Sequence, residues 1–242
     1  MTYIVGVYLD EDDAEELSRP LTVNVNALVH KHNIKTMNVV ATKEDFGYTA
    51  KYCTYCTLDD ESMQTYFPYE TVKLSKTSYT YDGKEKKPGV TVTDVLDQPI
   101  SKSEYTVTYP KSAKNVGKYT VTIKFKNHYA GTEKRTFTIN PKGTSLSKVT
   151  SPKKAQLKVT WKKQATQTTG YQVQYSTDKN FKKNNKTVTI SKNNTTSKSV
   201  GKLKAKKKYY VRVRTYKIVK FGGKSVKLYS GWSKAKSVTT KK

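Results

Sequence analysis

Apolar and polar residues alternate along much of the chain, and a period of two is typical of β-strands. The clearest case is the segment 118–126, in which Tyr119, Val121, Ile123 and Phe125 share one face while Thr and Lys occupy the other. Turn-forming residues separate similar short segments, a spacing typical of a β-sandwich. The strands predicted in this part of the chain are 72–74, 90–92, 105–109, 118–126 and 135–139.

The same pattern starts again after the linker Asn140–Gly143. The pair Gly222-Gly223 between strand-like flanks indicates a hairpin. The sequence therefore predicts an all-β fold of two tandem sandwiches, at residues 71–141 and 145–241. The strands predicted in the second sandwich are 157–161, 170–176, 187–190, 197–200 and 209–216.

Residues 1–70 lack this regular alternation and are predicted to be a small irregular segment, the end of a preceding region. The acidic run Asp10–Leu17 fits the first turn of a short helix or a solvated loop. Residues 21–25 alternate and indicate one isolated strand.

Charge divides the chain at the same places. Residues 1–70 carry a net charge of −7, residues 71–142 carry +8, and residues 143–242 carry +26, with Asp178 as their one acidic residue. A domain so basic attracts polyanions. Because Lys far outnumbers Arg, the main reader of guanine, no specific nucleic acid is predicted.

The chain contains no apolar run long enough for a transmembrane helix. Its N-terminus lacks the basic start of a signal peptide, since its apolar residues are followed by the acidic run from Asp10. The alternatives are a cytoplasmic chain or a fragment of a longer secreted protein.

Trp161 ends the predicted strand 157–161, and Leu203 is followed six residues later by Tyr209 and then by Val211 and Val213. With these residues, the segment 145–241 resembles a fibronectin type III module: Trp161 occupies the place of the core tryptophan of that family, and the run from Leu203 matches its L-x-P-x-x-x-Y-x-V-x-V pattern, with Ala205 in place of the proline. The resemblance implies that Tyr209 forms a tyrosine corner, in which its hydroxyl contacts upstream backbone. It also implies that these anchors are buried and structural.

Residues 71–141 resemble bacterial Ig-like repeats with a Tyr81-Asp82-Gly83 turn and a later Asn115–Val121 segment. The tandem resembles the C-terminal regions of large secreted proteins of Gram-positive anaerobes. It implies an extracellular chain on the bacterial surface, a fragment without its signal peptide.

Cys53 and Cys56 form the one site-like motif, a C-x-x-C. They suit a zinc half-site completed by His30 or His32, a short disulfide, or unliganded thiols. Zinc is the one cofactor that the sequence suggests.

No catalytic motif is recognisable, so the chain is predicted not to be an enzyme. His128 has no identifiable nucleophile partner and is predicted to be an exposed loop histidine. The function expected is a non-catalytic spacer or interaction module, with anionic cell-wall polymers, polysaccharides or other surface proteins as partners. The alternatives are a carbohydrate-binding module using exposed Tyr216 and Tyr229, or the accessory tail of a secreted hydrolase.

Binding to polyanions is expected to use diffuse charge rather than a shaped pocket. Lys204, Lys206, Lys207 and Lys208 surround the turn before the longest predicted strand and are expected to form a patch. Such binding weakens steeply as salt rises.

Overall fold

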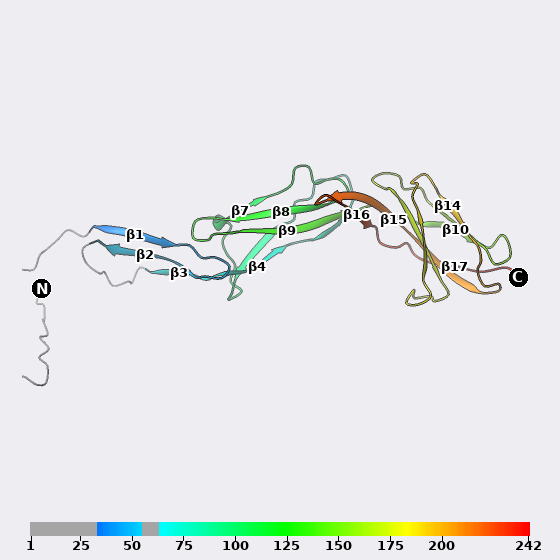
Figure 1. The fold of residues 1–242 in the computed structure, drawn as a ribbon, viewed down its shortest axis with the longest axis horizontal. Helices are drawn as coiled ribbons and strands as arrows, with labels where there is room; N and C mark the ends of the chain where they lie inside the picture. The colour runs from blue at the N-terminus through cyan, green and yellow to red at the C-terminus, as the bar shows by residue number, and fades with distance from the viewer. Residues whose placement is uncertain (1–32, 55–62) are drawn as a thin grey trace, which may run out of the picture.

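The computed structural model describes residues 33–54 and 63–242, and it is built from β-strands. In these two ranges, the one helical element is the 3-10 turn η1 (Lys102–Glu104). Three bodies follow one another along the long axis: a first sheet, a middle sandwich and a C-terminal sandwich (Figure 1). The prediction of an all-β fold with tandem sandwiches is confirmed.

The first sheet corrects the expectation of an irregular N-terminal segment. Its strands β1 (Ile34–Val39), β2 (Gly47–Cys53) and β3 (Gln64–Tyr66) pair antiparallel in that order. Every residue of β1 is exposed. Because neither face of β1 is buried, nothing in the fold requires its apolar residues to alternate, and the sequence signal for a strand is therefore weak.

The middle sandwich packs a two-stranded sheet, β4-β6, against a four-stranded sheet, β5-β9-β8-β7. The alternating face predicted for residues 118–126 lies in the core between them, with Val121 and Ile123 fully buried. The turn predicted at Tyr81-Asp82-Gly83 is present, with Gly83 at a φ of 80°. The strands are β4 (Tyr69–Leu74), β5 (Ser78–Thr80), β6 (Val90–Asp94), β7 (Tyr105–Thr108), β8 (Gly117–Phe125) and β9 (Thr132–Asn140).

The C-terminal sandwich has one sheet in the order β10-β11-β14 and another in the order β13-β12-β15-β16, with β17 also paired to β15. The strand β15 is 14 residues long, so β17 pairs with its beginning and β16 with its end. The strands are β10 (Leu146–Thr150), β11 (Leu157–Trp161), β12 (Gly170–Ser176), β13 (Lys186–Ile190), β14 (Ser197–Val200), β15 (Lys208–Phe221), β16 (Lys224–Tyr229) and β17 (Lys236–Thr239).

The sequence-predicted anchors of this sandwich lie in its core. Trp161 is 2% exposed, Tyr209 is 7% exposed, and Val211 and Val213 are fully buried. Leu203 was predicted to be buried but is only partly so, because it lies on the loop before β15 and packs against the edge of the core. The backbone N–H of Lys204 donates to the Tyr209 hydroxyl at 3.1 Å, which is the contact expected of a tyrosine corner.

Within the two described ranges, no helix has the length and apolar character that crossing a membrane requires.

Candidate functional site

The C-x-x-C motif is only partly visible. Cys53 ends β2, is buried, and lies opposite Ile34 in the β1-β2 pairing. Cys56, His30 and His32 lie outside the described residues, so the zinc site stays a prediction. Among the residues that are described, no three His, Cys, Asp or Glu side chains group closely enough to hold a metal ion.

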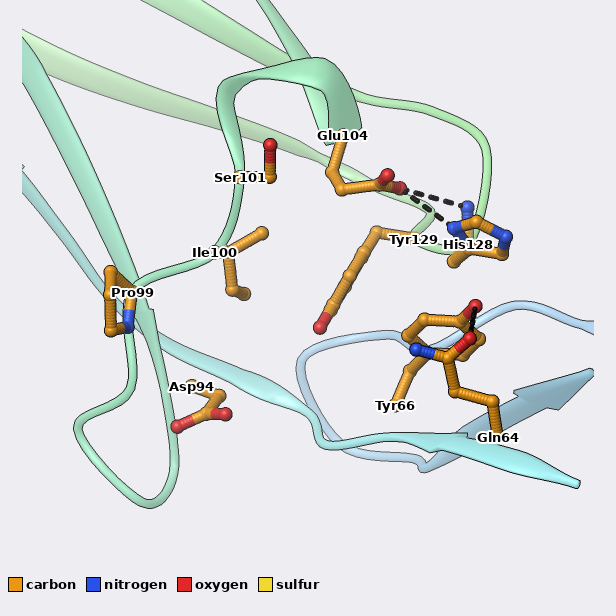
Figure 2. A pocket seen from close by; sticks show the side chains of 9 residues that line it. All are labelled: Gln64, Tyr66, Asp94, Pro99, Ile100, Ser101, Glu104, His128 and Tyr129. Atoms are coloured by element: carbon orange, nitrogen blue, oxygen red, sulfur yellow. Dashed lines mark hydrogen bonds and ion pairs between the residues drawn. The ribbon is translucent and has the colours of Figure 1, made fainter.

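A pocket of about 330 Å³ opens where the first sheet meets the middle sandwich (Figure 2). Its polar side chains come from β3, from the end of β6 and from the loops around η1 and between β8 and β9. We call it the His128 pocket. It is lined by Gln64, Tyr66, Asp94, Pro99, Ile100, Ser101, Glu104, His128 and Tyr129.

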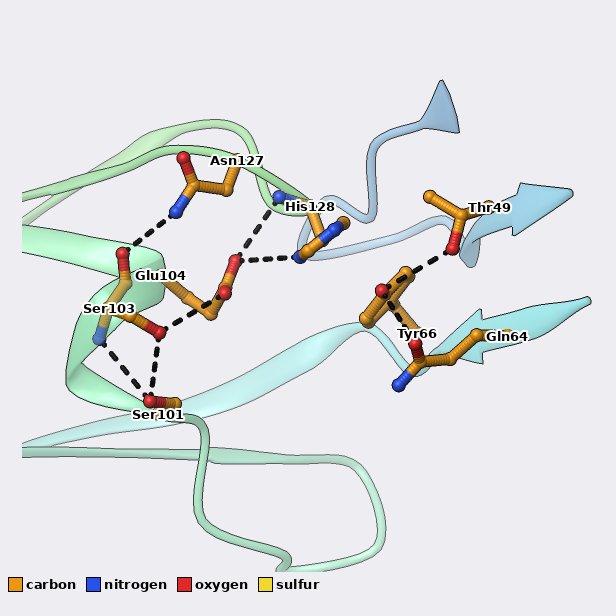
Figure 3. A network of polar contacts seen from close by, with 8 residues as sticks. All are labelled: Thr49, Gln64, Tyr66, Ser101, Ser103, Glu104, Asn127 and His128. Atoms are coloured by element: carbon orange, nitrogen blue, oxygen red, sulfur yellow. Dashed lines mark hydrogen bonds and ion pairs between the residues drawn. The ribbon is translucent and has the colours of Figure 1, made fainter. Parts of the chain in front are cut away.

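Glu104 is the centre of the polar network in this pocket (Figure 3). One of its oxygens contacts both the backbone N–H and the Nδ1 of His128, each at 3.2 Å. The other accepts a hydrogen bond from the Ser103 hydroxyl at 3.3 Å. His128 was predicted to be an exposed loop histidine; it is instead about two-thirds buried and held in place by this carboxylate.

Tyr66 of the first sheet stacks on the ring of His128, with 4.2 Å between centroids. Its hydroxyl donates to Gln64 at 3.1 Å and lies 3.4 Å from the Thr49 hydroxyl. The network therefore joins a side chain of β3 to the loop between β8 and β9.

This arrangement is unsuited to nucleophilic catalysis. In a serine triad the histidine lies between the nucleophile and the acid. Here the acid, Glu104, lies between Ser103 and His128, and in the described part of the chain no hydroxyl forms a hydrogen bond with the histidine. Asp94 is also committed, because its Oδ1 accepts the backbone N–H groups of Leu96 and Gln98 at 2.9 Å and caps that turn.

Backbone hydrogen bonds beside the His128 pocket indicate that the residues around it have a structural role. Ala41, fully buried after β1, donates to the carbonyl of His128 at 2.7 Å and accepts from Ala130 at 2.8 Å. The Tyr69 N–H donates to the Thr42 carbonyl at 3.2 Å. These bonds and the stacked Tyr66 and His128 hold the first sheet against the middle sandwich.

The second candidate region is the surface of the C-terminal sandwich. Every lysine from 143 to 242 is exposed except Lys217, and the lysines predicted to form a patch, Lys204 and Lys206–Lys208, are among the exposed ones. The carboxylate of Asp178 accepts backbone N–H groups from Asn180, Lys182 and Lys183, which lower its pKa. The ion pairs found among the described residues all lie before residue 136, so none neutralises these lysines.

The tyrosines proposed for sugar stacking are not open platforms. Tyr216 is 2% exposed, so the expectation that it is exposed is wrong; it lies on the same face of β15 as Arg212 and Arg214, covers Gly170 and packs against Tyr229 with 6.2 Å between ring centroids. Tyr229 is half-buried beneath the Arg214 guanidinium, whose carbon lies 3.9 Å from the ring centroid. Arg214 also lies over Trp232, and Arg212 lies between Trp232 and Phe181. Cations therefore cover this row of aromatic rings.

Comparisons with known proteins address the C-terminal sandwich. Residues 139–230 match the family model described as fibronectin type III domain. No curated protein matches the chain. Among solved structures, the fn3 domain of the human collagen alpha-1(XX) chain is 18% identical, with 41% of this chain and 85% of that chain covered and a TM-score of 0.33. The chicken CNTN1 FN1-FN3 domains are 16% identical, with 81% and 78% covered and a TM-score of 0.35.

The family match covers β10 to β16. It includes the core tryptophan Trp161 and the tyrosine corner at Tyr209, two of the anchors on which the resemblance rested. The C-terminal sandwich is a fibronectin type III domain.

Proposed function

We propose that this chain is a non-catalytic spacer and interaction segment of an exported bacterial surface protein, and that its fibronectin type III domain associates with anionic wall polymers or polysaccharides. The observation that carries the proposal is the basic surface of this domain. Its lysines other than Lys217 are exposed, and its one acid, Asp178, accepts hydrogen bonds from backbone N–H groups. Such a surface attracts polyanions over a Debye length of about 8 Å at physiological salt.

The spacer role is supported by the in-line arrangement of the three bodies (Figure 1). Hydrogen bonds connect neighbouring bodies in addition to the linkers. Ala41 bonds the first sheet to the middle sandwich, and Gln167 bonds the middle sandwich to the fibronectin type III domain at Asn115 and Val116. A chain that is bonded at each joint holds its ends apart better than flexibly tethered domains do.

The partner class is tested by titrating the whole chain with a phosphate-bearing wall polymer, a sulfated polysaccharide and neutral dextran. We expect both anionic polymers to bind at about 50 mM salt and to lose at least about tenfold in affinity by about 200 mM, because bound counterions are released on binding. Neutral dextran should not bind. The proposed partner class would be rejected if neither anionic polymer bound at the lower salt concentration.

A further inference from the structure

One part of the basic surface is a shaped pocket of about 420 Å³, within the size range of ligand sites. Its floor comes from β12 and β15, and its rim comes from the β12-β13 loop, the start of β13 and the β14-β15 loop. We call it the lysine pocket. It is lined by Tyr175, Thr177, Asn184, Lys186, Lys202, Leu203, Lys204, Lys207 and Tyr209.

The charges around this pocket are all of one sign. Lys186, Lys202, Lys204 and Lys207 contribute four ammonium groups, and none forms an ion pair within the described parts of the chain. No Asp or Glu lines the pocket. Four like charges around one hollow repel one another, and an anion placed among them relieves that repulsion.

The rim is preorganised by buried contacts. Thr240, 2% exposed, accepts the Lys207 N–H at its hydroxyl oxygen at 3.0 Å and donates to the Lys204 carbonyl at 2.6 Å. The Tyr209 hydroxyl accepts the Lys204 N–H. The segment that carries three of the four lysines is thus fixed before any ligand arrives, which lowers the entropic cost of binding.

The floor offers a hydrogen-bond donor that the fold does not use. Tyr175 is 8% exposed and lines the pocket, yet its hydroxyl has no hydrogen-bond partner among the described residues. Burial raises the pKa of Tyr175, and the neighbouring Tyr209 raises it further, so the hydroxyl keeps its proton. Its neighbour Tyr209 packs edge-on at 6.3 Å between ring centroids and gives the floor an apolar part.

We infer that the lysine pocket is a defined binding site for a phosphate or sulfate ester of an extended carbohydrate or polyol polymer. The ammonium groups hold the tetrahedral oxyanion, the Tyr175 hydroxyl donates to one of its oxygens, and the tyrosine rings face the apolar side of the adjoining unit. This inference rests on the proposed function and replaces the expectation of purely diffuse binding with an anchored site. The two sources of this chemistry are phosphodiester wall polymers and sulfated polysaccharides.

The experiment uses the full chain and two probes of matched charge, a short glycerol phosphate oligomer and a sulfated oligosaccharide. The first variant is Tyr175→Phe, which removes one hydroxyl and no charge. We expect a loss of about tenfold or more in affinity, since a hydrogen bond to a charged group is lost. The probe whose affinity falls more in the Tyr175→Phe variant identifies the source of the ester.

The second comparison keeps the change in net charge equal. Lys204→Gln/Lys207→Gln alters the pocket, whereas Lys158→Gln/Lys198→Gln removes two exposed lysines from the opposite sheet, on β11 and β14. We expect the pocket pair to lose at least about ten times more affinity than the control pair, because only the pocket pair contacts the anion. Unchanged thermal unfolding verifies that each variant is folded.

The outcomes separate the two proposals. Equal losses for both lysine pairs, with no effect of Tyr175→Phe, would overturn the pocket and leave diffuse association standing. Failure of the unmodified chain to bind either probe would overturn the proposed function together with the pocket.

Discussion

At the scale of single residues, Trp161 is the largest fully buried side chain of the molecule. It packs against Tyr171 with 5.4 Å between ring centroids, while its Nε1–H is buried without a hydrogen-bond partner among the described residues. We expect Trp161→Ala to lower the free energy of unfolding of the fibronectin type III domain by about 3–5 kcal/mol, as core aromatic truncations do.

Trp161→Phe should lower the free energy of unfolding distinctly less than Trp161→Ala does. It keeps a ring beside Tyr171 and removes the N–H that has no partner among the described residues. Urea denaturation followed by the fluorescence of Trp232 and by circular dichroism measures both variants. A loss of unfolding free energy below about 1.5 kcal/mol in Trp161→Ala would show that the Trp161 side chain is not a core anchor.

Residue patterns predicted the core positions well and the partly exposed ones poorly. Trp161, Tyr209, Val211 and Val213 were correctly placed in the core because alternation along a strand fixes which residues face inward. Tyr216 lies on the opposite face of that same strand, and its burial comes from packing over Gly170 and against the Tyr229 ring, which the alternation along the strand does not reveal. The lysine pocket was missed because its members come from two loops and three strands, and their proximity follows from folding rather than from spacing.

At the scale of elements, the predicted strands of both sandwiches match the structure, several of them residue for residue, as with β11, β12 and β14. Two of the elements that escaped prediction are short or exposed: β5 has three residues, and β1 is exposed along its whole length. Periodicity reports burial, so a strand that buries no face leaves little trace in the sequence.

Gly47 packs tightly against the Val39–Ala41 segment that attaches the first sheet to the middle sandwich. A Cβ on Gly47 would lie 2.3 Å from the Ala41 nitrogen and 2.6 Å from the Val39 carbonyl oxygen, which is closer than real atoms approach. Ala41 is the residue bonded to His128 and Ala130 of the middle sandwich. We therefore expect Gly47→Ala to displace the Ala41 segment and loosen the first sheet while leaving both sandwiches folded.

Amide hydrogen exchange tests this expectation. Overpacking a site typically destabilises it by about 1–3 kcal/mol, so amide exchange at Ala41, Ala130 and the β1-β2 hairpin should accelerate by roughly tenfold or more. Exchange in β11 and β12 should not change. Gly201→Ala is the matched control, since a Cβ there meets no atom within 4 Å. Unaltered exchange at Ala41 in the Gly47 variant would contradict the proposed attachment.

At the scale of the whole molecule, the joint between the two sandwiches is the feature that the sequence left open. The linker predicted from Asn140–Gly143 is short, but the joint is made chiefly by residues far from it. The hairpin of β15 and β16 extends toward the middle sandwich, where Lys118 lies over the Phe221 ring at 4.7 Å from its centroid. An isolated sequence shows neither the length of this hairpin nor what its tip contacts.

Gln167 is the centre of the joint. Its Oε1 accepts from the Val116 N–H at 3.2 Å and from the Lys217 ammonium, and its Nε2 donates to Asn115 at 3.2 Å. Desolvation lowers the pKa of Lys217, consistent with a contact partly closed to water. Once these bonds and the Phe221 ring are removed, the linker and the hydrogen bond from the Thr215 hydroxyl to the Lys142 carbonyl still connect the two bodies.

We therefore expect Gln167→Ala/Phe221→Ala to convert a stiff joint into a flexible one without unfolding either sandwich, because interfaces of this kind between domains are modest in area. Small-angle scattering should show a broader distribution of interatomic distances, and NMR alignment should give different tensors for the two sandwiches instead of one. Gln164→Ala is the control, since the side chain of Gln164 makes no hydrogen bond within the described part of the chain. If the double variant aligned as one rigid body, the stiffness of the spacer would have to come from the linker itself.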